Sequence, residues 1–222
     1  GKSTIMNLLC RFYDVTDGEV LVDGRNVKDL DLYNLRQNIG MAMQDVFLFS
    51  DTVEGNIAYS RPDCPFEAVQ KAAVMADADS FIREMPDGYD TIVGERGVGL
   101  SGGQKQRISL ARALLKEPSI LILDDTTSAV DMETESYIQQ QLNNIDHACT
   151  IFIVAYRISS IKDSDLILVL NDGKIVEQGT HDELLKNNGY YATVFRHQYG
   201  EFEKYVDEIN QNNRGGETYG TK

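Results

Sequence analysis

A chain of 222 residues is long enough to bury a sizeable core, as one large domain or two small ones. Hydrophobic residues make up 42% of it and charged residues 25%, an ordinary globular composition that excludes wholesale disorder and a coiled-coil rod. Against 21 basic residues stand 35 acidic ones, and the net charge of −14 would repel a phosphate backbone, so we expect no nucleic-acid partner. The apolar runs are far shorter than the roughly 20 residues that a membrane helix needs.

The N-terminal part of the chain predicts a helix followed by short strands. Apolar residues at helical spacing predict a helix over residues 3–13. Turn signals flank residues 19–22 and predict a hairpin strand there, and residues 39–43 predict another strand. The chain opens on Gly1 with no initiator Met and no preceding strand, so we expect an N-terminally truncated fragment.

From residue 53 to 115 the pattern becomes mostly helical, with a glycine-rich interruption over residues 94–103. We interpret this region as a helical insertion. After Pro118, the apolar run Ile120 to Leu123 is too short for a helix and predicts a buried parallel strand. A helix is expected next, over residues 131–145.

The C-terminal third returns to strands and helices. Strands are predicted at residues 150–155 and 166–170, the second of which turns into a closing hairpin strand. Thr180 can cap a helix, with Glu183 three positions further on. The remaining expectations are a hairpin strand over 174–178, a helix over 190–209 and a polar tail over 210–222. Alternating strands and helices predict an α/β fold with a mainly parallel sheet.

Two separate segments have the residues of a nucleotide site. Lys2 is followed by the hydroxyls of Ser3 and Thr4 where the first helix begins, which is typical of the back half of a phosphate-binding loop. Asp124 ends a hydrophobic strand, which suits a carboxylate near a magnesium ion at the carboxyl edge of a sheet. Asp125 follows where an ATPase would place the carboxylate that orients or deprotonates the attacking water.

A third segment, Leu100 to Gln104, has small residues just before a predicted helix. The first backbone N–H groups of such a helix have no partner within it, so this segment is an anion site in its own right. The sequence Leu-Ser-Gly-Gly-Gln specifies five residues, which makes a chance match improbable.

With these motifs the sequence resembles the nucleotide-binding domain of ATP-binding cassette (ABC) transporters, from residue 1 to about residue 206. The matching segments are Gly1 to Thr4 (end of Walker A), Gln44 (Q-loop), Leu100 to Gln104 (signature), Ile120 to Asp124 (Walker B) and Ser128 to Asp131 (D-loop). Residues 91–97 are similar to the X-loop of the exporter branch, which includes multidrug and lipid exporters.

The resemblance implies a P-loop NTPase fold, in which a helical subdomain is inserted into a RecA-like core with a parallel sheet. The core would comprise residues 1–44 and 116–209, and the helical subdomain residues 45–115. It also implies a place at the cytoplasmic face of the cell membrane, where the X-loop region would lie near the coupling helices of a transmembrane domain.

The resemblance further implies ATP and Mg²⁺ as cofactors and a head-to-tail dimer, so that one chain serves two sites. In its own site, the residues around the phosphates and the metal would be Gly1, Lys2, Ser3, Thr4, Gln44 and Asp124, with Ser3, Gln44 and Asp124 serving Mg²⁺. Across the dimer, the residues facing the partner's nucleotide would be Ser101, Gly102, Gly103, Gln104 and Asp131.

Two positions depart from the family pattern, and both concern hydrolysis. Asp125 stands where the family usually has glutamate, and its carboxylate is one methylene short of the water-activating position. Tyr156 stands where the family usually has the switch histidine, and a phenol cannot reproduce the contact of an imidazole with the γ-phosphate. We therefore expect a chain whose ATP binding survives better than its turnover.

An intact signature beside an altered catalytic site favours a heterodimer, whose other chain would carry the Glu and the His together with a degraded signature. One alternative is a homodimeric exporter that uses Asp125 as a weak base. Another, from a different class, is an ATP-binding regulatory module that is not coupled to transport.

Overall fold

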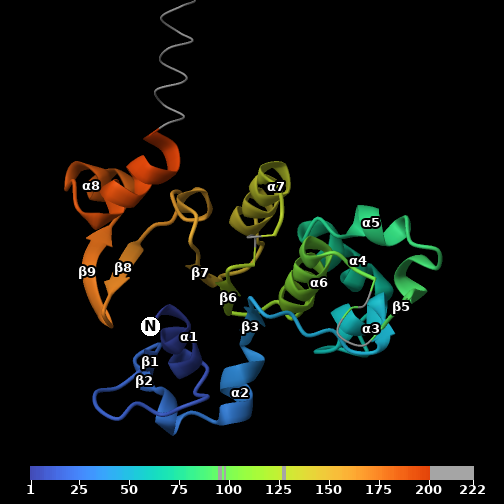
Figure 1. Ribbon diagram of the computed structural model, residues 1–222. Helices are drawn as coiled ribbons and strands as arrows, with labels where there is room; N and C mark the ends of the chain where they lie inside the picture. The colour runs from blue at the N-terminus through green and yellow to red at the C-terminus, as the bar shows by residue number, and fades with distance from the viewer. Residues whose placement is uncertain (95–96, 98, 127–128, 201–222) are drawn as a thin grey trace, which may run out of the picture. The chain divides into compact units, whose positions relative to one another are not determined.

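The computed structural model describes residues 1–94, 97, 99–126 and 129–200 (Figure 1). The chain forms two compact units, residues 1–156 and residues 157–222, and each is described by itself. Among the described helices, none combines the length and the apolar character needed to cross a membrane.

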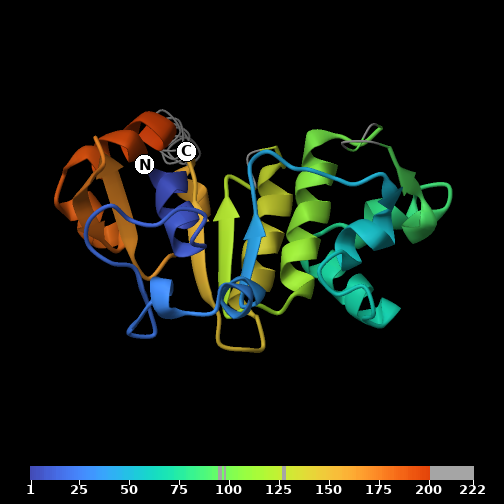
Figure 2. The ribbon, with the colours of Figure 1, turned by 90° about the horizontal axis from the view of Figure 1, so that it is seen from below.

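A three-stranded parallel sheet lies at the centre of the first unit, in the order β3 (Ile39–Ala42), β6 (Ile120–Asp124) and β7 (Thr150–Val154). Figure 2 shows β3 and β6 side by side and pointing the same way. Strand β6 is covered on both faces: Ile122 belongs to one hydrophobic cluster, while Leu121 and Leu123 belong to another. Burial on both faces explains why this strand is a continuous apolar run instead of an alternating one.

One face of the sheet is covered by the N-terminal elements. Met6 of helix α1 (Lys2–Leu9) and Leu35 of helix α2 (Leu32–Gln37) belong to the same hydrophobic cluster as Ile122. The other elements here are a short hairpin, β1 (Leu21–Val22) and β2 (Arg25–Asn26), and the 3₁₀ turn η1 (Val27–Asp29). Helix α1 ends just before Arg11, whose φ is +50°, and helix α2 begins after Asp31, whose side chain caps its N-terminus.

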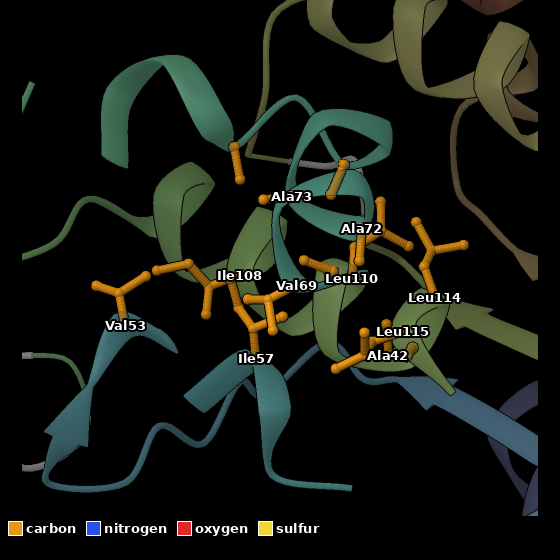
Figure 3. Close-up of a cluster of buried hydrophobic side chains, with 14 of the residues drawn as sticks. Ala42, Val53, Ile57, Val69, Ala72, Ala73, Ile108, Leu110, Leu114 and Leu115 are labelled. Atoms are coloured by element: carbon orange, nitrogen blue, oxygen red, sulfur yellow. The ribbon is translucent and has the colours of Figure 1, made fainter. Parts of the chain in front are cut away.

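The opposite face is covered by two helices, α6 (Gly102–Leu115) and α7 (Met132–Asn143). The helical insertion predicted over residues 53–115 ends with α6. Its earlier part packs on α6 and comprises α3 (Val53–Ala58), α4 (Phe66–Met75), α5 (Asp79–Arg83), the 3₁₀ turn η2 (Gly88–Asp90) and β5 (Ile92–Val93), which pairs antiparallel with β4 (Asp51–Thr52). Figure 3 shows Ile57 of α3 and Val69 of α4 beside Ile108 of α6. Each fully buried aliphatic side chain of this kind contributes about 1.5–3 kcal/mol to folding.

Close backbone contact between α6 and β3 depends on Gly40. A Cβ at this position would lie 2.8 Å from the Ala113 carbonyl oxygen and 2.8 Å from Pro118. Both distances are shorter than real Cβ contacts, so only glycine lets this strand lie directly against the helix.

A buried polar cluster joins the loop after β3 to α3 and α6. Asn56 is fully buried, at 0% exposure, and accepts a hydrogen bond from Phe49 N–H while its amide donates to the carbonyls of Phe49 and Thr52. Arg112 of α6 donates to Asn56 Oδ1 at 3.0 Å and to the Asn56 carbonyl at 2.7 Å. These bonds satisfy the backbone of a loop that has no strand partner.

The second unit is a small hairpin with helices. After the 3₁₀ turn η4 (Ile158–Ser160), β8 (Ile167–Asn171) pairs antiparallel with β9 (Lys174–Gly179). Helix α8 (His181–Lys186) begins with the predicted capping box, in which Thr180 and Glu183 bond each other's backbone. A further helix covers residues 190–200, where burial raises the pKa of Tyr191 to about 12.

The expected elements are confirmed for the most part. The first helix was predicted too long, because the chain turns at Arg11, and the hairpin strand over residues 19–22 is reduced to β1. The pair β4–β5 inside the helical insertion was missed. The second half of the helix expected over residues 190–209, together with the polar tail, lies outside the described residues. The predicted helical subdomain, residues 45–115, falls wholly within the first unit, and its boundaries stay a prediction.

Replacing Asn56 tests the buried polar cluster. Asn56→Ala removes the side-chain partner of the Phe49 N–H and of the Phe49 and Thr52 carbonyls, and it removes one of the acceptors of Arg112, at about 1–3 kcal/mol for each buried group left unsatisfied. We expect a loss of about 3 kcal/mol in the free energy of unfolding, measured by urea titration. Asn34→Ala, which removes an exposed amide from α2, should stay within about 0.5 kcal/mol of the wild type. Equal losses in the two variants would contradict the role given to Asn56.

Candidate functional site

Several of the predicted site residues follow strands at the carboxyl edge of the parallel sheet. Leu123 pairs with Ala42 and Asp124 pairs with Val154, so the three strands end side by side. Gln44 follows the first of these strands and Asp125 the second. The Gln44 amide donates to Asp125 Oδ2 at 3.3 Å, which brings the Q-loop and Walker B positions into direct contact.

Asp125 has an unusual backbone conformation, and its side chain contacts Gln44. Its φ is +52°, in the left-handed region, while its N–H donates to the Val154 carbonyl at 2.8 Å. The strand pairing therefore continues one residue beyond β6 before the chain turns away. Aspartate is among the few non-glycine residues that adopt this conformation readily.

Lys2 lies at the same edge, on the first turn of α1. Its Nζ is 4.2 Å from the centroid of the Tyr156 ring, within the range of a cation–π interaction. Tyr156 follows β7 by two residues and is 64% exposed. The two positions at which the sequence departs from its family pattern are thus both in contact with predicted site residues: Asp125 with Gln44, and Tyr156 with Lys2.

The donor set at this edge suits a hard cation and phosphate. Ser3 supplies a hydroxyl, Gln44 an amide oxygen and Asp124 a carboxylate, which are the oxygen ligands that Mg²⁺ prefers. Ser3 and Thr4 lie in the first turn of α1, whose free N–H groups favour anions. Among the described residues, no group of three or more His, Cys, Asp or Glu side chains could hold a metal ion.

The signature segment forms the N-terminus of α6, as the sequence predicts. The Ser101 hydroxyl accepts from Gln104 N–H at 3.2 Å, and Gln104 Oε1 accepts from Ser101 N–H at 2.9 Å. This capping box uses only acceptor capacity, so the Ser101 hydroxyl hydrogen and the Gln104 amide N–H groups can still be donated to an anion. The capping box thus leaves side-chain donors at the start of α6, although it occupies the backbone N–H groups of Ser101 and Gln104.

The second signature glycine is needed because the D-loop backbone approaches it closely. A Cβ at Gly103 would lie 2.9 Å from the Ala129 carbonyl oxygen, whereas one at Gly102 would lie 3.7 Å from the Ala129 side chain. Only the first distance is too short for a real side chain. Ser128, which begins the predicted D-loop, and Glu95 and Arg96 of the predicted X-loop lie outside the described residues.

Asp131, the last D-loop residue, caps α7. It accepts from Thr134 N–H at 2.9 Å, and this hydrogen bond lowers the pKa of the Asp131 carboxyl below its ordinary value. The Thr134 hydroxyl also lies 3.2 Å from Asp77 Oδ2, and Arg107 of α6 donates to the same carboxylate at 2.8 Å. The D-loop, the helical insertion and α6 are thus joined through polar side chains.

Sequence reasoning missed Gln106, Arg107, Asn56 and Arg112. Gln106 is 7% exposed, and it shares one face of α6 with Gly103 and Leu110, at helical spacing. A glutamine on an otherwise apolar and small-residue face is the signal that could have found it, because a buried amide needs partners.

The described residues of the first unit line at least two hollows. One, of about 470 Å³, is lined by Gln44, Asp45, Val46, Phe47, Gly102, Lys105 and Gln106. The other, of about 610 Å³, lies by Pro118, Leu121 of β6 and Cys149, which precedes β7, and none of the predicted site residues lines it. The smaller hollow is the better candidate for part of the functional site, because its lining includes Gln44 of the predicted Q-loop and Gly102 of the predicted signature.

Parallel strands, a helix N-terminus at their carboxyl edge and an inserted helical region define an α/β nucleotide-binding domain of the P-loop NTPase class. The family model described as "ABC transporter" matches residues 1–128, and the chain belongs to this family.

Relatives and a solved structure agree with this assignment. The chain is 55% identical over 199 residues to the "Uncharacterized ABC transporter ATP-binding protein YknU" of Bacillus subtilis, covering 90% of this chain and 34% of that protein. It is 50% identical over 202 residues to the "ATP-dependent lipid A-core flippase" of Photobacterium profundum, again covering 90% and 34%. The structure of a bacterial Atm1-family ABC exporter with ATP bound superposes with a TM-score of 0.86 at 45% identity, covering 89% of this chain and 35% of that one. The chain therefore spans about a third of the length of these proteins.

The two signature glycines make a matched pair of substitutions. Gly102→Ala should leave stability unchanged or raise it by up to about 1 kcal/mol, because alanine favours a helix over glycine. Gly103→Ala should lower the free energy of unfolding by about 1–3 kcal/mol, because its methyl group overlaps the Ala129 carbonyl. Chemical unfolding of both variants distinguishes the two effects, and a shift of the same sign and size in both would contradict the close approach.

The lowered pKa of Asp131 predicts how its stabilising effect depends on pH. Because the ionised form is favoured in the folded state, its contribution is present above the ordinary aspartate pKa of about 4 and is lost as the pH falls through the lowered value. We expect the difference in unfolding free energy between the wild type and Asp131→Asn to be constant from about pH 7 to 5 and to shrink below about pH 4.

The control is Thr134→Val, which removes the hydroxyl and keeps the backbone N–H that dominates the effect. The pH dependence of Asp131→Asn should persist in this background. A difference that is the same at every pH would argue against the ionised cap.

Proposed function

We propose that this chain is the ATP-binding part of an ABC exporter, which binds Mg-ATP, dimerises and thereby drives export across a membrane. Family membership supports ATP binding, and the names of relatives support export: a "putative multidrug export ATP-binding/permease protein" of B. subtilis is 50% identical over 195 residues, and the superposed structure is an exporter. In this proposal the chain lies at the cytoplasmic face of the membrane, and transmembrane segments outside it determine the transported substrate.

The carboxyl edge of the sheet would hold the nucleotide. Lys2 and the N–H groups at the start of α1 would bind the phosphates, because the lysine is positively charged, the N–H groups carry partial positive charge and the phosphates are negative. Ser3, Gln44 and Asp124 would hold Mg²⁺, which neutralises phosphate charge when bound. This arrangement binds and orients ATP whether or not the site hydrolyses it quickly.

The chain's own site is proposed to be catalytically weak. Aspartate at position 125 ends about an ångström short of where a glutamate would end, and a misplacement of that size costs roughly 10²-fold in rate. A well-placed general base contributes about 10² to 10⁴. The contact of Gln44 with Asp125 supports this proposal, because the carboxylate is held by the Q-loop side chain.

Tyr156 affects the same step from the other side. A histidine at this position would offer a compact imidazole, whereas the tyrosine ring lies over the Lys2 ammonium at 4.2 Å. This contact is the observation that carries the proposal of a degenerate site, because the residue in the switch position contacts the phosphate-binding lysine. Phosphate and the ring would compete for the same ammonium.

The signature, by contrast, is intact and presents donors. Ser101, Gly102, Gly103 and Gln104 would complete the site of a second ATP-binding chain, with Asp131 beside them. The economical assembly is a heterodimer, in which the partner carries a glutamate and a histidine at the positions of Asp125 and Tyr156 and a degraded signature. ATP at the weak site would hold the dimer while hydrolysis at the other site drives the cycle.

Two alternatives remain distinct from this proposal. A homodimeric exporter would use Asp125 as a weak base and would show turnover when the chain is purified without a partner. A regulatory ATP-binding module would bind ATP without coupling to transport. The similarity of residues 1–128 to the ABC transporter model and the exporter relatives weigh against the module.

The deciding experiment compares ATP turnover of the full-length protein that carries this chain, purified alone, with the same protein carrying Asp125→Glu and Tyr156→His. The natural protein should be at least about 10²-fold slower than the double variant, because the variant restores the reach of the base and the imidazole. The steady-state rate of phosphate release measures the turnover of the natural protein and of the double variant.

The control double variant is Asp172→Glu with Tyr190→His. Asp172 also has a positive φ, +47°, and Tyr190 is also exposed, so this variant makes the same chemical changes at two residues to which no role in the site is assigned. It should turn over at the rate of the natural protein. Ordinary turnover by the natural protein alone would reject the degenerate site and favour the homodimer.

A further inference from the structure

We infer that Gln106 is a positioning residue that links the two ATP sites served by this chain, through its contacts with Asp125 and Ala129. The inference rests on the proposed function, in which Asp125 belongs to the chain's own site and the start of α6 to the site of the partner. Nothing in the sequence motifs assigns a role to this glutamine.

The contacts of Gln106 join α6 to both ends of one loop. Its amide nitrogen donates to the Asp125 carbonyl at 3.4 Å, and its amide oxygen accepts from Ala129 N–H at 3.3 Å. The side chain is only 7% exposed. Because Asp125 directly follows the Walker B strand and Ala129 belongs to the predicted D-loop, one side chain contacts both motifs.

A second contact makes the same helix sensitive to the D-loop. Gly103, one turn before Gln106, lies so close to the Ala129 carbonyl that no Cβ fits between them. A displacement of the signature turn therefore moves Ala129, and Gln106 transmits this movement to the Asp125 backbone. Asp125 cannot shift alone, because its N–H is bonded to Val154 and its side chain to Gln44.

Glutamine is suited to this link because its amide is both a donor and an acceptor. Methionine has a similar size and shape but can replace neither hydrogen bond. Glutamate keeps the acceptor for Ala129 N–H and, when ionised, loses the donor to the Asp125 carbonyl. Of the two hydrogen bonds to Asp125 and Ala129, glutamine thus makes both, glutamate keeps one and methionine keeps neither, at nearly constant side-chain volume.

The test is a double-mutant cycle in the full-length protein assembled with its second ATP-binding chain. Lys2→Ala empties the chain's own site, and turnover at the site completed by its signature is then measured with and without Gln106→Met. In the natural background Lys2→Ala should change this turnover about ten-fold, within the usual range of coupling between sites. In the Gln106→Met background the change should fall below about two-fold.

Two readouts separate positioning from a loss of structure. Gln106→Met alone should lower kcat about five-fold or more while KM for ATP stays within about two-fold, because it acts on the geometry of the bound state. Gln106→Glu should give an intermediate coupling, since one of the two bonds remains. Where the methionine variant does not fold, the glutamate variant alone decides the question.

Gln140→Met is the matched control, since it removes an exposed amide from α7 and should leave both the turnover and the coupling unchanged. Coupling that is equal in the natural and the Gln106→Met backgrounds would overturn the inference. If the protein proves to be a homodimer, the same cycle is run with both changes in one copy. The link is then tested even where the heterodimer proposal has failed.

Discussion

Direct backbone contact at two glycines holds helix α6 against the rest of the first unit. Near its C-terminal end, Gly40 of β3 lies against the Ala113 carbonyl, and near its N-terminal end, Gly103 lies against the Ala129 carbonyl. Between these points the helix is buried on most of its surface, with α3 and α4 on one side and the sheet on the other. The position of the signature relative to the sheet edge is therefore set by packing that tolerates little displacement.

The elements that could be predicted are those whose signal is local. The apolar run of β6 predicted a buried strand, and the pair Thr180 and Glu183 predicted the capping box of α8, because each pattern contains its own physical cause. The pair β4–β5 was missed, since each strand has only two residues and is stabilised by pairing with a partner that lies beyond residues 53–91, a mostly helical segment. The early end of α1 depends on the left-handed turn at Arg11, a residue type that rarely marks such a turn.

The candidate site divides in the same way. The strand end predicted Asp124 and Asp125 at the carboxyl edge of the sheet, and the family resemblance implied Gln44 near the same magnesium ion. The 3.3 Å contact of Gln44 with Asp125 is compatible with both, and the catalytic roles of these residues stay a prediction. The cation–π contact of Lys2 with Tyr156 joins residues more than 150 positions apart and has no signature in the sequence. Arg107, Arg112 and Asn56 were missed for a related reason: their partners are mostly backbone carbonyls, and any residue type supplies a carbonyl.

The left-handed backbone conformation of residue 125 also bears on which side chain suits this position. Longer side chains adopt a φ near +52° less readily than aspartate does, so a glutamate at this position adds conformational strain to the strand exit. A site selected for rapid hydrolysis must tolerate that strain, because the longer glutamate side chain brings its carboxylate to the attacking water. A site that only needs to retain its nucleotide is released from this compromise, and the relaxed residue can persist because stability and catalysis no longer oppose each other at one position.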